Sequence, residues 1–262
     1  MKVNIIQMDM KFKDLDANYE KAEALIRQAC ESSPDVICLP EAWNSGFFPK
    51  DDLRDYSDNN GERTKAFLGG LAKELNVNIV GGSVPNIKND KVYNTSFTFN
   101  RYGECVGEYD KIHSFSYMNE HHYFQPGENL VTFELDGVKC GIIICYDVRF
   151  LELVRTLALD GISILFVVAQ WPVPRLKHWQ VLNNARAIEN QIYLVSNNSC
   201  GKADETVYAG HSAIIDPWGE VLAEGGYDEE IITRDIDLKI VEEIRNTINV
   251  YRDRRTDLYK LD

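Results

Sequence analysis

A cysteine follows an apolar, strand-like run in the segment Gly141-Ile-Ile-Ile-Cys145-Tyr-Asp-Val-Arg149-Phe. Apolar residues then recur at helical spacing from Phe150 to Leu157, which predicts a helix with Asp147 as its N-cap. A thiol at a helix N-terminus lies near backbone N–H donors and the positive end of the helix dipole, which favour a thiolate and stabilise an oxyanion. Cys145 is therefore a candidate nucleophile; the alternative is a small buried core residue.

Two further strand-like runs also end in ionisable side chains. In Asp35-Val-Ile-Cys-Leu-Pro-Glu41, a short apolar run ends at a proline and a glutamate. In Glu108-Tyr-Asp-Lys111-Ile-His113, a lysine follows the strand-like stretch from Glu104 to Tyr109. Taken singly, each fits an ordinary charged loop residue. A glutamate, a lysine and a cysteine thus stand at the ends of three strand-like runs.

These three segments resemble those of the nitrilase superfamily of carbon–nitrogen hydrolases. Leu39-Pro-Glu41 is similar to the family's general-base segment, Tyr109-Asp-Lys111-Ile-His113 to its lysine segment, and Cys145-Tyr-Asp-Val-Arg149-Phe to its nucleophile elbow. The likeness continues through Arg186–Gln191, Gly210–Gly219 and Arg254–Tyr259, so it covers essentially the whole chain. Chance is a poor explanation for the joint match.

Within the superfamily the chain is most similar to the ω-amidases, a group that includes Nit2 and the bacterial methionine-salvage amidase. Met118-Asn-Glu120-His121, Trp171-Pro-Val-Pro174-Arg175-Leu and His178-Trp179 carry this narrower likeness. Two positions depart from the family pattern: Leu151 replaces a proline that is common after Arg-Phe, and Ser114 replaces a common leucine. Neither removes a catalytic group, so they concern packing and substrate fit.

The resemblance implies four catalytic residues and an amide hydrolysis through a thioester. Cys145 attacks the carbonyl carbon, and Glu41 moves the proton to the leaving nitrogen and then activates water. Lys111 and the backbone N–H of Tyr146 hold the oxyanion, and the carboxylate beside Lys111 offsets the cost of burying its charge. Glu120 corresponds to the family's second glutamate, which orients the lysine; the alternative is a glutamate in a polar surface loop.

The substrate implied by the resemblance is the terminal amide of a small dicarboxylic acid monoamide, of the 2-oxoglutaramate or 2-oxosuccinamate type. Its distal carboxylate must be paired when it is buried. Arg175 is the candidate partner, because Trp171-Pro-Val-Pro174 is a stiff segment after a predicted strand, where ligands collect in α/β sheets. The alternative is a solvated loop charge. We take Tyr146, Trp171 and Arg175 as substrate-binding residues. We expect Arg149 to form a structural ion pair with Glu152 or Glu189 and not to contact the substrate.

Two other functions stay open from the sequence. An N-carbamoyl amine or amino-acid amidohydrolase of the same superfamily would share the chemistry and differ only in its pocket. A non-catalytic nitrilase-fold scaffold that binds a partner would be favoured by the loss of Glu41, Lys111 or Cys145, and all three are present.

Length, net charge and cysteine spacing limit the number of domains, the kinds of partner and the compartment. The 262 residues contain no linker or repeat, so we expect one domain over residues 1–262. The net charge of −13 argues against nucleic-acid and anionic-membrane partners, which need basic surface. Six cysteines without CxxC spacing and an N-terminus unlike a signal peptide predict reduced thiols in a cytoplasm. The histidines form no ligand set and no nucleotide-binding glycine loop is present, so no metal or cofactor is expected.

Alternating strands and helices predict an α/β fold. Strands are expected at Val3–Met8, Val36–Leu39, Asn78–Gly81, Ile162–Ala169 and Ile192–Ser196, and helices at Ala17–Ala29, Glu62–Leu75, Asp147–Leu159 and Lys177–Glu189. Antiparallel pairs are expected around Arg101–Gly103, Asp136–Gly137 and Asp216–Gly219. These patterns indicate mixed sheets, and the resemblance implies a four-layer α-β-β-α sandwich. It also implies a homodimer that uses Ile236–Ile248 and the tail Arg254–Tyr259.

Overall fold

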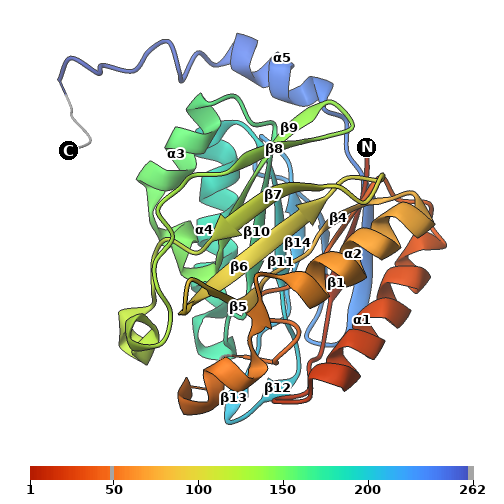
Figure 1. Cartoon of the computed structure of the whole chain (residues 1–262). Coiled ribbons are helices and arrows are strands. Elements are labelled where there is room, and N and C mark those ends of the chain that lie inside the picture. Colours follow the sequence, from red (N-terminus) through yellow and green to blue (C-terminus); the bar gives the residue numbers. More distant parts are fainter. Residues whose placement is uncertain (48–49, 259–262) are drawn as a thin grey trace.

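The structure is a computed structural model that describes residues 1–47 and 50–258. Two large sheets pack face to face, and a pair of helices covers the outer face of each sheet (Figure 1). The order of layers is therefore helix, sheet, sheet, helix. This confirms the predicted α/β class with mixed sheets and a four-layer sandwich.

The first sheet has eight strands in the order β16-β1-β2-β4-β6-β5-β3, with β7 paired to β6. Their bounds are β1 Lys2–Gln7, β2 Val36–Cys38, β3 Asp58–Asn59, β4 Asn78–Val80, β5 Val84–Lys88, β6 Lys91–Phe99, β7 Cys105–Asp110 and β16 Glu230–Asp235. The helices α1 (Leu15–Cys30) and α2 (Glu62–Leu75) pack on its outer face. Strands β1, β2 and β4 are parallel, so the loop with Glu41 leaves at the edge where they end.

The second sheet has six strands in the order β15-β14-β11-β10-β9-β8. Their bounds are β8 Thr132–Leu135, β9 Val138–Ile144, β10 Ile164–Ala169, β11 Tyr193–Asn198, β14 Ala213–Ile215 and β15 Val221–Glu224. The helices α3 (Leu151–Leu159) and α4 (Leu176–Asn190) cover its outer face, and β12 (Lys202–Ala203) pairs with β13 (Thr206–Val207). Strands β9, β10 and β11 are parallel, so Cys145 and Gln170 emerge at one edge.

Alternation along β9 explains why a continuous apolar run forms a strand here. Ile142 and Ile144 belong to the core between the two sheets, whereas Ile143 belongs to the core under α3 and α4. Strands covered on both faces need apolar side chains at every position, because neither face meets water. The segment before Cys145 is therefore anchored on both sides.

Most predicted elements agree with the structure to within about three residues, but the helix after Cys145 does not begin at Asp147. A short 3-10 helix, η4 (Cys145–Arg149), comes first, and α3 begins at Leu151. Asp147 was expected to be the N-cap of that helix, and this was wrong. Its carboxylate instead accepts hydrogen bonds from the Ile144 backbone N–H at 3.0 Å and the Tyr109 hydroxyl at 2.7 Å.

The C-terminal part of the described chain leads away from the layers. Helix α5 (Lys239–Thr247) is followed by a segment that extends beyond the sandwich (Figure 1). Of the tail expected to reach a partner, residues 255–258 are exposed, and Tyr259 lies outside the described residues. Short 3-10 helices complete the fold: η1 Lys50–Tyr56, η2 Ser116–Met118, η3 Glu120–His122 and η5 Val173–Arg175. Among residues 1–47 and 50–258, no helix combines the length and apolar character needed to cross a bilayer.

Candidate active site

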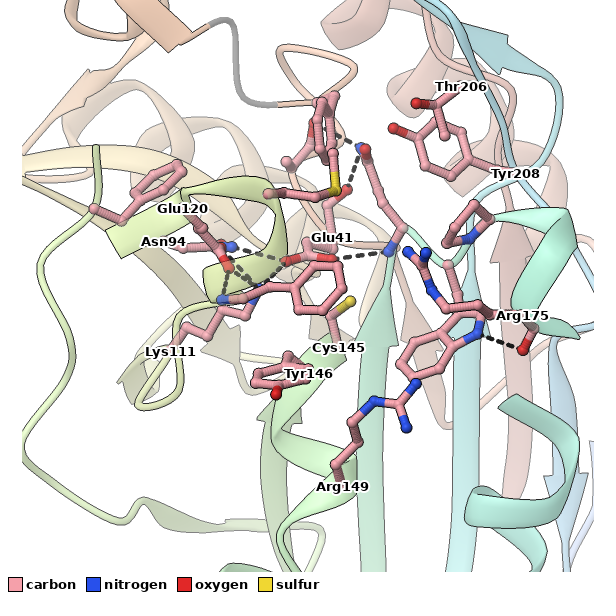
Figure 2. Close-up of a pocket in the computed structure, with 18 residues that line it drawn as sticks. Glu41, Asn94, Lys111, Glu120, Cys145, Tyr146, Arg149, Arg175, Thr206 and Tyr208 are labelled. Carbon is pink, nitrogen blue, oxygen red and sulfur yellow. Dashed lines mark hydrogen bonds and ion pairs between the residues drawn. The ribbon is translucent and has the colours of Figure 1, made fainter. Parts of the chain in front are cut away.

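Glu41, Lys111, Glu120 and Cys145 line one pocket (Figure 2). Glu41 follows β2 and Lys111 follows β7 in the first sheet, while Cys145 follows β9 in the second. Glu120 begins the short helix η3. The structure thus brings all four expected catalytic residues together from separate parts of the chain.

Lys111 lies between the two glutamates in a buried ionic cluster. Its Nζ is 3.0 Å from Glu41 Oε1, and 2.8 Å and 3.0 Å from the two carboxylate oxygens of Glu120. The three residues are only 6%, 5% and 3% exposed for Glu41, Lys111 and Glu120. Burial alone would lower the pKa of Lys111, but the charges of Glu120 and Glu41 outweigh it and raise that pKa well above its ordinary value. Lys111 is therefore a fixed positive charge.

Further donors fix the two carboxylates. Glu41 Oε1 accepts from Asn94 Nδ2 at 2.8 Å, and Glu41 Oε2 accepts from the Gln170 backbone N–H at 2.8 Å. Glu120 Oε2 accepts from the Phe115 backbone N–H at 2.6 Å. Neither Asn94 nor Gln170 was predicted as a site residue from the sequence. Gln170 directly follows the predicted strand Ile162–Ala169, so the strand-end signal used for Cys145 also applies to it.

Cys145 has a left-handed backbone, with φ of 50°. Non-glycine residues rarely adopt this conformation, and it is held here between β9 and η4. Burial raises the pKa of the Cys145 thiol well above its ordinary value, and the charge of Glu41 adds to the increase, although Lys111 acts against it. The helix that begins at Cys145 has only five residues, and burial together with the neighbouring carboxylate favours the thiol instead of the expected thiolate.

The expected substrate-binding residues Tyr146, Trp171 and Arg175 also line this pocket. The Trp171 backbone N–H donates to Asn198 Oδ1 at 2.6 Å, and its indole N–H donates to the Arg175 carbonyl at 2.8 Å. The Arg175 guanidinium lies 5.1 Å from the centre of the Phe115 ring. Figure 2 shows Arg175 on the opposite side of Cys145 from Lys111.

The sequence assigned Arg149 to a different role and gave no signal for Tyr208, and both residues line the pocket. Arg149 was expected to pair with Glu152 or Glu189, but among the described residues it forms an ion pair with neither. Glu189 pairs with Arg186 at 2.8 Å, and the Arg149 guanidinium lies 4.9 Å from the centre of the Trp171 ring. Tyr208, which no sequence pattern singled out, is buried against the pocket. Its hydroxyl has no hydrogen-bond partner among the described residues.

Charge divides the pocket into two ends. The end with Lys111 also carries the two carboxylates, Glu41 and Glu120. The other end carries the guanidinium groups of Arg149 and Arg175, neither of which forms an ion pair with a carboxylate in residues 1–47 and 50–258. The described part of the chain also contains no group of three or more side chains able to hold a metal ion. The arrangement places a thiol, two carboxylates and an ammonium group at one end, and two guanidinium groups, each near an aromatic ring, at the other.

Comparison with known proteins agrees with this geometry. The model of the carbon–nitrogen hydrolase family matches residues 2–246. The chain belongs to the carbon–nitrogen hydrolase family. This carbon–nitrogen hydrolase is 42% identical over 257 residues to the 2-oxoglutaramate amidase of Bacillus subtilis. The matched region covers 98% of this chain and 98% of the relative. It is 36% identical over 260 residues to human omega-amidase NIT2, covering 94% of this chain and 92% of the relative.

Solved structures give the same assignment. The crystal structure of Saccharomyces cerevisiae Nit3, a member of branch 10 of the nitrilase superfamily, matches with a TM-score of 0.91 and 30% identity, covering 97% of this chain and 96% of Nit3. The predicted membership of the nitrilase superfamily and the likeness to ω-amidases are therefore confirmed. This carbon–nitrogen hydrolase is an enzyme that hydrolyses carbon–nitrogen bonds other than peptide bonds, and the scaffold alternative finds no support among these relatives.

Proposed function

We propose that the chain is an amidase that hydrolyses the terminal amide of a small dicarboxylic acid monoamide, of the 2-oxoglutaramate or 2-oxosuccinamate type, to a carboxylate and ammonia. The observation that carries this proposal is the division of the pocket: a catalytic cluster beside Cys145 lies at one end, and at the other lie two guanidinium groups that have no carboxylate partner among residues 1–47 and 50–258. A substrate with an amide at one end and a carboxylate at the other matches both ends. The names of the Bacillus and human relatives support the same substrate class.

The first half-reaction forms a thioester. Because the raised pKa keeps the Cys145 thiol protonated, Glu41 removes the proton as Sγ bonds to the carbonyl carbon. Negative charge develops on the carbonyl oxygen, where Lys111 and the backbone N–H of Tyr146 stabilise it. Glu41 then gives its proton to the nitrogen, the carbon–nitrogen bond breaks, and ammonia leaves.

The second half-reaction restores the thiol. Water attacks the thioester carbon, and Glu41 accepts a proton from that water. The carbon–sulfur bond then breaks, the proton returns to Cys145, and the carboxylic acid product leaves. Glu120 holds Lys111 throughout through hydrogen bonds of 2.8 Å and 3.0 Å, so the cation is in place before charge develops.

The opposite end of the pocket determines which amides fit. A distal carboxylate placed near the half-buried Arg175 and Arg149 makes charge-assisted hydrogen bonds to their guanidinium groups. An amino acid amide such as glutamine carries an ammonium group next to its carboxylate, and two guanidinium groups repel that ammonium. We expect the enzyme to prefer 2-oxo acid monoamides to glutamine and to neutral amides.

Ammonia release across a substrate panel tests the proposal. Arg175→Ala is expected to raise KM for 2-oxoglutaramate by about 30-fold, a loss of about 2 kcal/mol, while neutral amides keep their rates. Lys177→Ala, which removes an exposed cation two residues away, is the matched control. It should change neither the KM for 2-oxoglutaramate nor the rates on neutral amides. Equal losses on charged and neutral amides would contradict the carboxylate contact. Preferred turnover of N-carbamoyl compounds would instead assign the chain to the related amidohydrolases.

We also propose a homodimer and a cytoplasmic location. Val181 and Ile188 on α4 and Val221 on β15 are 49%, 47% and 48% exposed, and they line one groove on the outer face of the second sheet. A closed dimer across this face would cover apolar surface and place the extended C-terminal segment on the partner. The six cysteines are all free thiols, which supports a reducing compartment.

A further inference from the structure

Asp147 makes four hydrogen bonds that the reaction described above does not use. The residue is fully buried and lies two positions after Cys145. Its Oδ2 accepts from the Tyr109 hydroxyl at 2.7 Å and the Ile144 backbone N–H at 3.0 Å. Its Oδ1 accepts from the His113 backbone N–H at 3.0 Å and lies 2.8 Å from His113 Nδ1.

The hydrogen-bond partners of Asp147 lie next to Lys111 and Cys145 in the sequence, and both of these residues must reach the substrate carbonyl. Tyr109 and His113 lie two residues before and two residues after Lys111, whereas Ile144 directly precedes Cys145. The lysine segment leaves β7 in the eight-stranded sheet, and Cys145 leaves β9 in the six-stranded sheet. One carboxylate therefore joins both loops across the sandwich.

The surroundings make this junction rigid. The His113 ring stacks on Phe150, with 3.6 Å between ring centres and 8° between ring planes, which holds the plane of the ring beside Asp147. Burial, together with the charge of Asp147, raises the pKa of the Tyr109 hydroxyl well above its ordinary value, so it stays a donor.

We propose that Asp147 is a positioning residue that sets the distance between the Lys111 ammonium and the Cys145 sulfur. Oxyanion stabilisation requires a donor about 3 Å from the oxygen that develops charge, and a misplacement of about 1 Å costs roughly 100-fold in rate. The Lys111 ammonium itself is held by hydrogen bonds to Glu41 and Glu120. Asp147 instead holds the chain on either side of Lys111, through Tyr109 and His113. This inference rests on the proposed amidase function.

The test compares Asp147→Asn with the wild type. The amide group keeps the shape of the carboxylate but loses two of the four accepted bonds, because its nitrogen donates. We expect kcat to fall about 100-fold, with KM and the rate of Cys145 alkylation by iodoacetamide within about threefold of wild type, since the thiol and the distal end stay intact. Tyr109→Phe, which removes one donor, should give a smaller loss and add little to Asp147→Asn in the double variant.

Asp216→Asn is the matched control, because Asp216 is also buried and accepts two backbone N–H bonds, but in the turn between β14 and β15. It should leave kcat unchanged. A purely structural role predicts that Asp147→Asn lowers the melting temperature while kcat per alkylatable Cys145 stays at the wild-type value, and that result would overturn the proposal. If Asp147→Asn does not fold, an unchanged kcat in Tyr109→Phe would overturn it instead.

Failure of this inference is distinguishable from failure of the proposed function. A wild-type enzyme that hydrolyses no amide contradicts the amidase assignment itself. An active wild type with an equally active Asp147→Asn variant contradicts only the role of Asp147.

Discussion

The Cys145 thiol lies beside Glu41, and this neighbour affects its chemistry in two opposite ways. The carboxylate raises the thiol pKa, which keeps sulfur protonated at rest, but it is also the group able to remove that proton. Proton transfer and attack on the carbonyl must then occur together. A resting thiol of this kind differs from the low-pKa cysteines that react with any electrophile.

A pH profile of alkylation tests this state of the thiol. Because burial and Glu41 raise the pKa of Cys145, the thiolate fraction should rise about tenfold per pH unit through neutral pH and beyond the ordinary thiol pKa of about 8.5. The iodoacetamide reaction at Cys145, followed by peptide mass spectrometry, should therefore accelerate with pH without levelling near neutrality. A plateau below pH 7 would show a stable thiolate.

Glu41 and Lys111 should behave as one unit in mutagenesis. Lys111→Met leaves two buried carboxylates without their cation, and Glu41→Gln removes the base together with one of the two carboxylates paired with Lys111, so each change is expected to lower kcat/KM by about 100-fold or more. The double variant should lie close to the worse single variant. The partly exposed pair Lys88 and Glu108 offers a control, where the same changes should be small and additive. Additive losses at Glu41 and Lys111 would refute the coupling.

Sequence patterns identified some of these residues and not others for physical reasons. Glu41, Lys111 and Cys145 follow apolar runs, so their positions at strand ends were visible. Asn94 lies inside β6, where a single buried amide has no periodic signal. Tyr208 follows a two-residue strand that no hydrophobic pattern predicts.

At the level of elements, the loop that carries Glu41 depends on a close approach by the chain after β4. Gly82 has φ of 60°, and a Cβ at this position would lie 2.0 Å from the Pro40 carbonyl oxygen. Only glycine leaves room for that oxygen, so Gly82 fixes the backbone directly before Glu41.

Substitution of this glycine should displace the base. Gly82→Ala is expected to destabilise the fold by about 1–3 kcal/mol and to lower kcat, because the Pro40-Glu41 backbone must move. Gly70→Ala is the control, since a Cβ on this α2 residue meets nothing within 4 Å and should stabilise the helix by up to about 1 kcal/mol. Thermal unfolding and steady-state rates measure both. Wild-type kcat in folded Gly82→Ala would contradict the argument.

Element prediction from the sequence succeeded where burial imposed a pattern. The long helices and the doubly covered strands β9 and β10 follow apolar periodicity, and turns with Asp-Gly or Pro-Trp-Gly marked two hairpins. The edge strand β16 was not predicted. Among the described strands it pairs with β1 alone, and half of its residues are exposed. Asp147 was misassigned because a sequence pattern does not show that a distant loop will supply its donors.

At the scale of the whole molecule, the exposed apolar residues on α4 and β15 bear on assembly. If the proposed dimer forms across this face, sedimentation should show a dimer at micromolar concentration, and Val181→Glu should give a monomer, because a buried unpaired charge opposes association. Tyr102→Glu is a control, since that exposed residue lies in the turn between β6 and β7. A wild-type monomer at micromolar concentration would contradict the dimer.

Covalent capture of the acyl group on Cys145 tests the thioester mechanism. Wild-type enzyme quenched with acid during turnover of 2-oxoglutaramate, then digested and analysed by mass spectrometry, should carry the substrate acyl group on the peptide that contains Cys145. Cys145→Ala should remain folded, form no adduct and release no ammonia. An acyl group on Cys105 or Cys200, or ammonia release that persists in Cys145→Ala, would contradict the thioester mechanism.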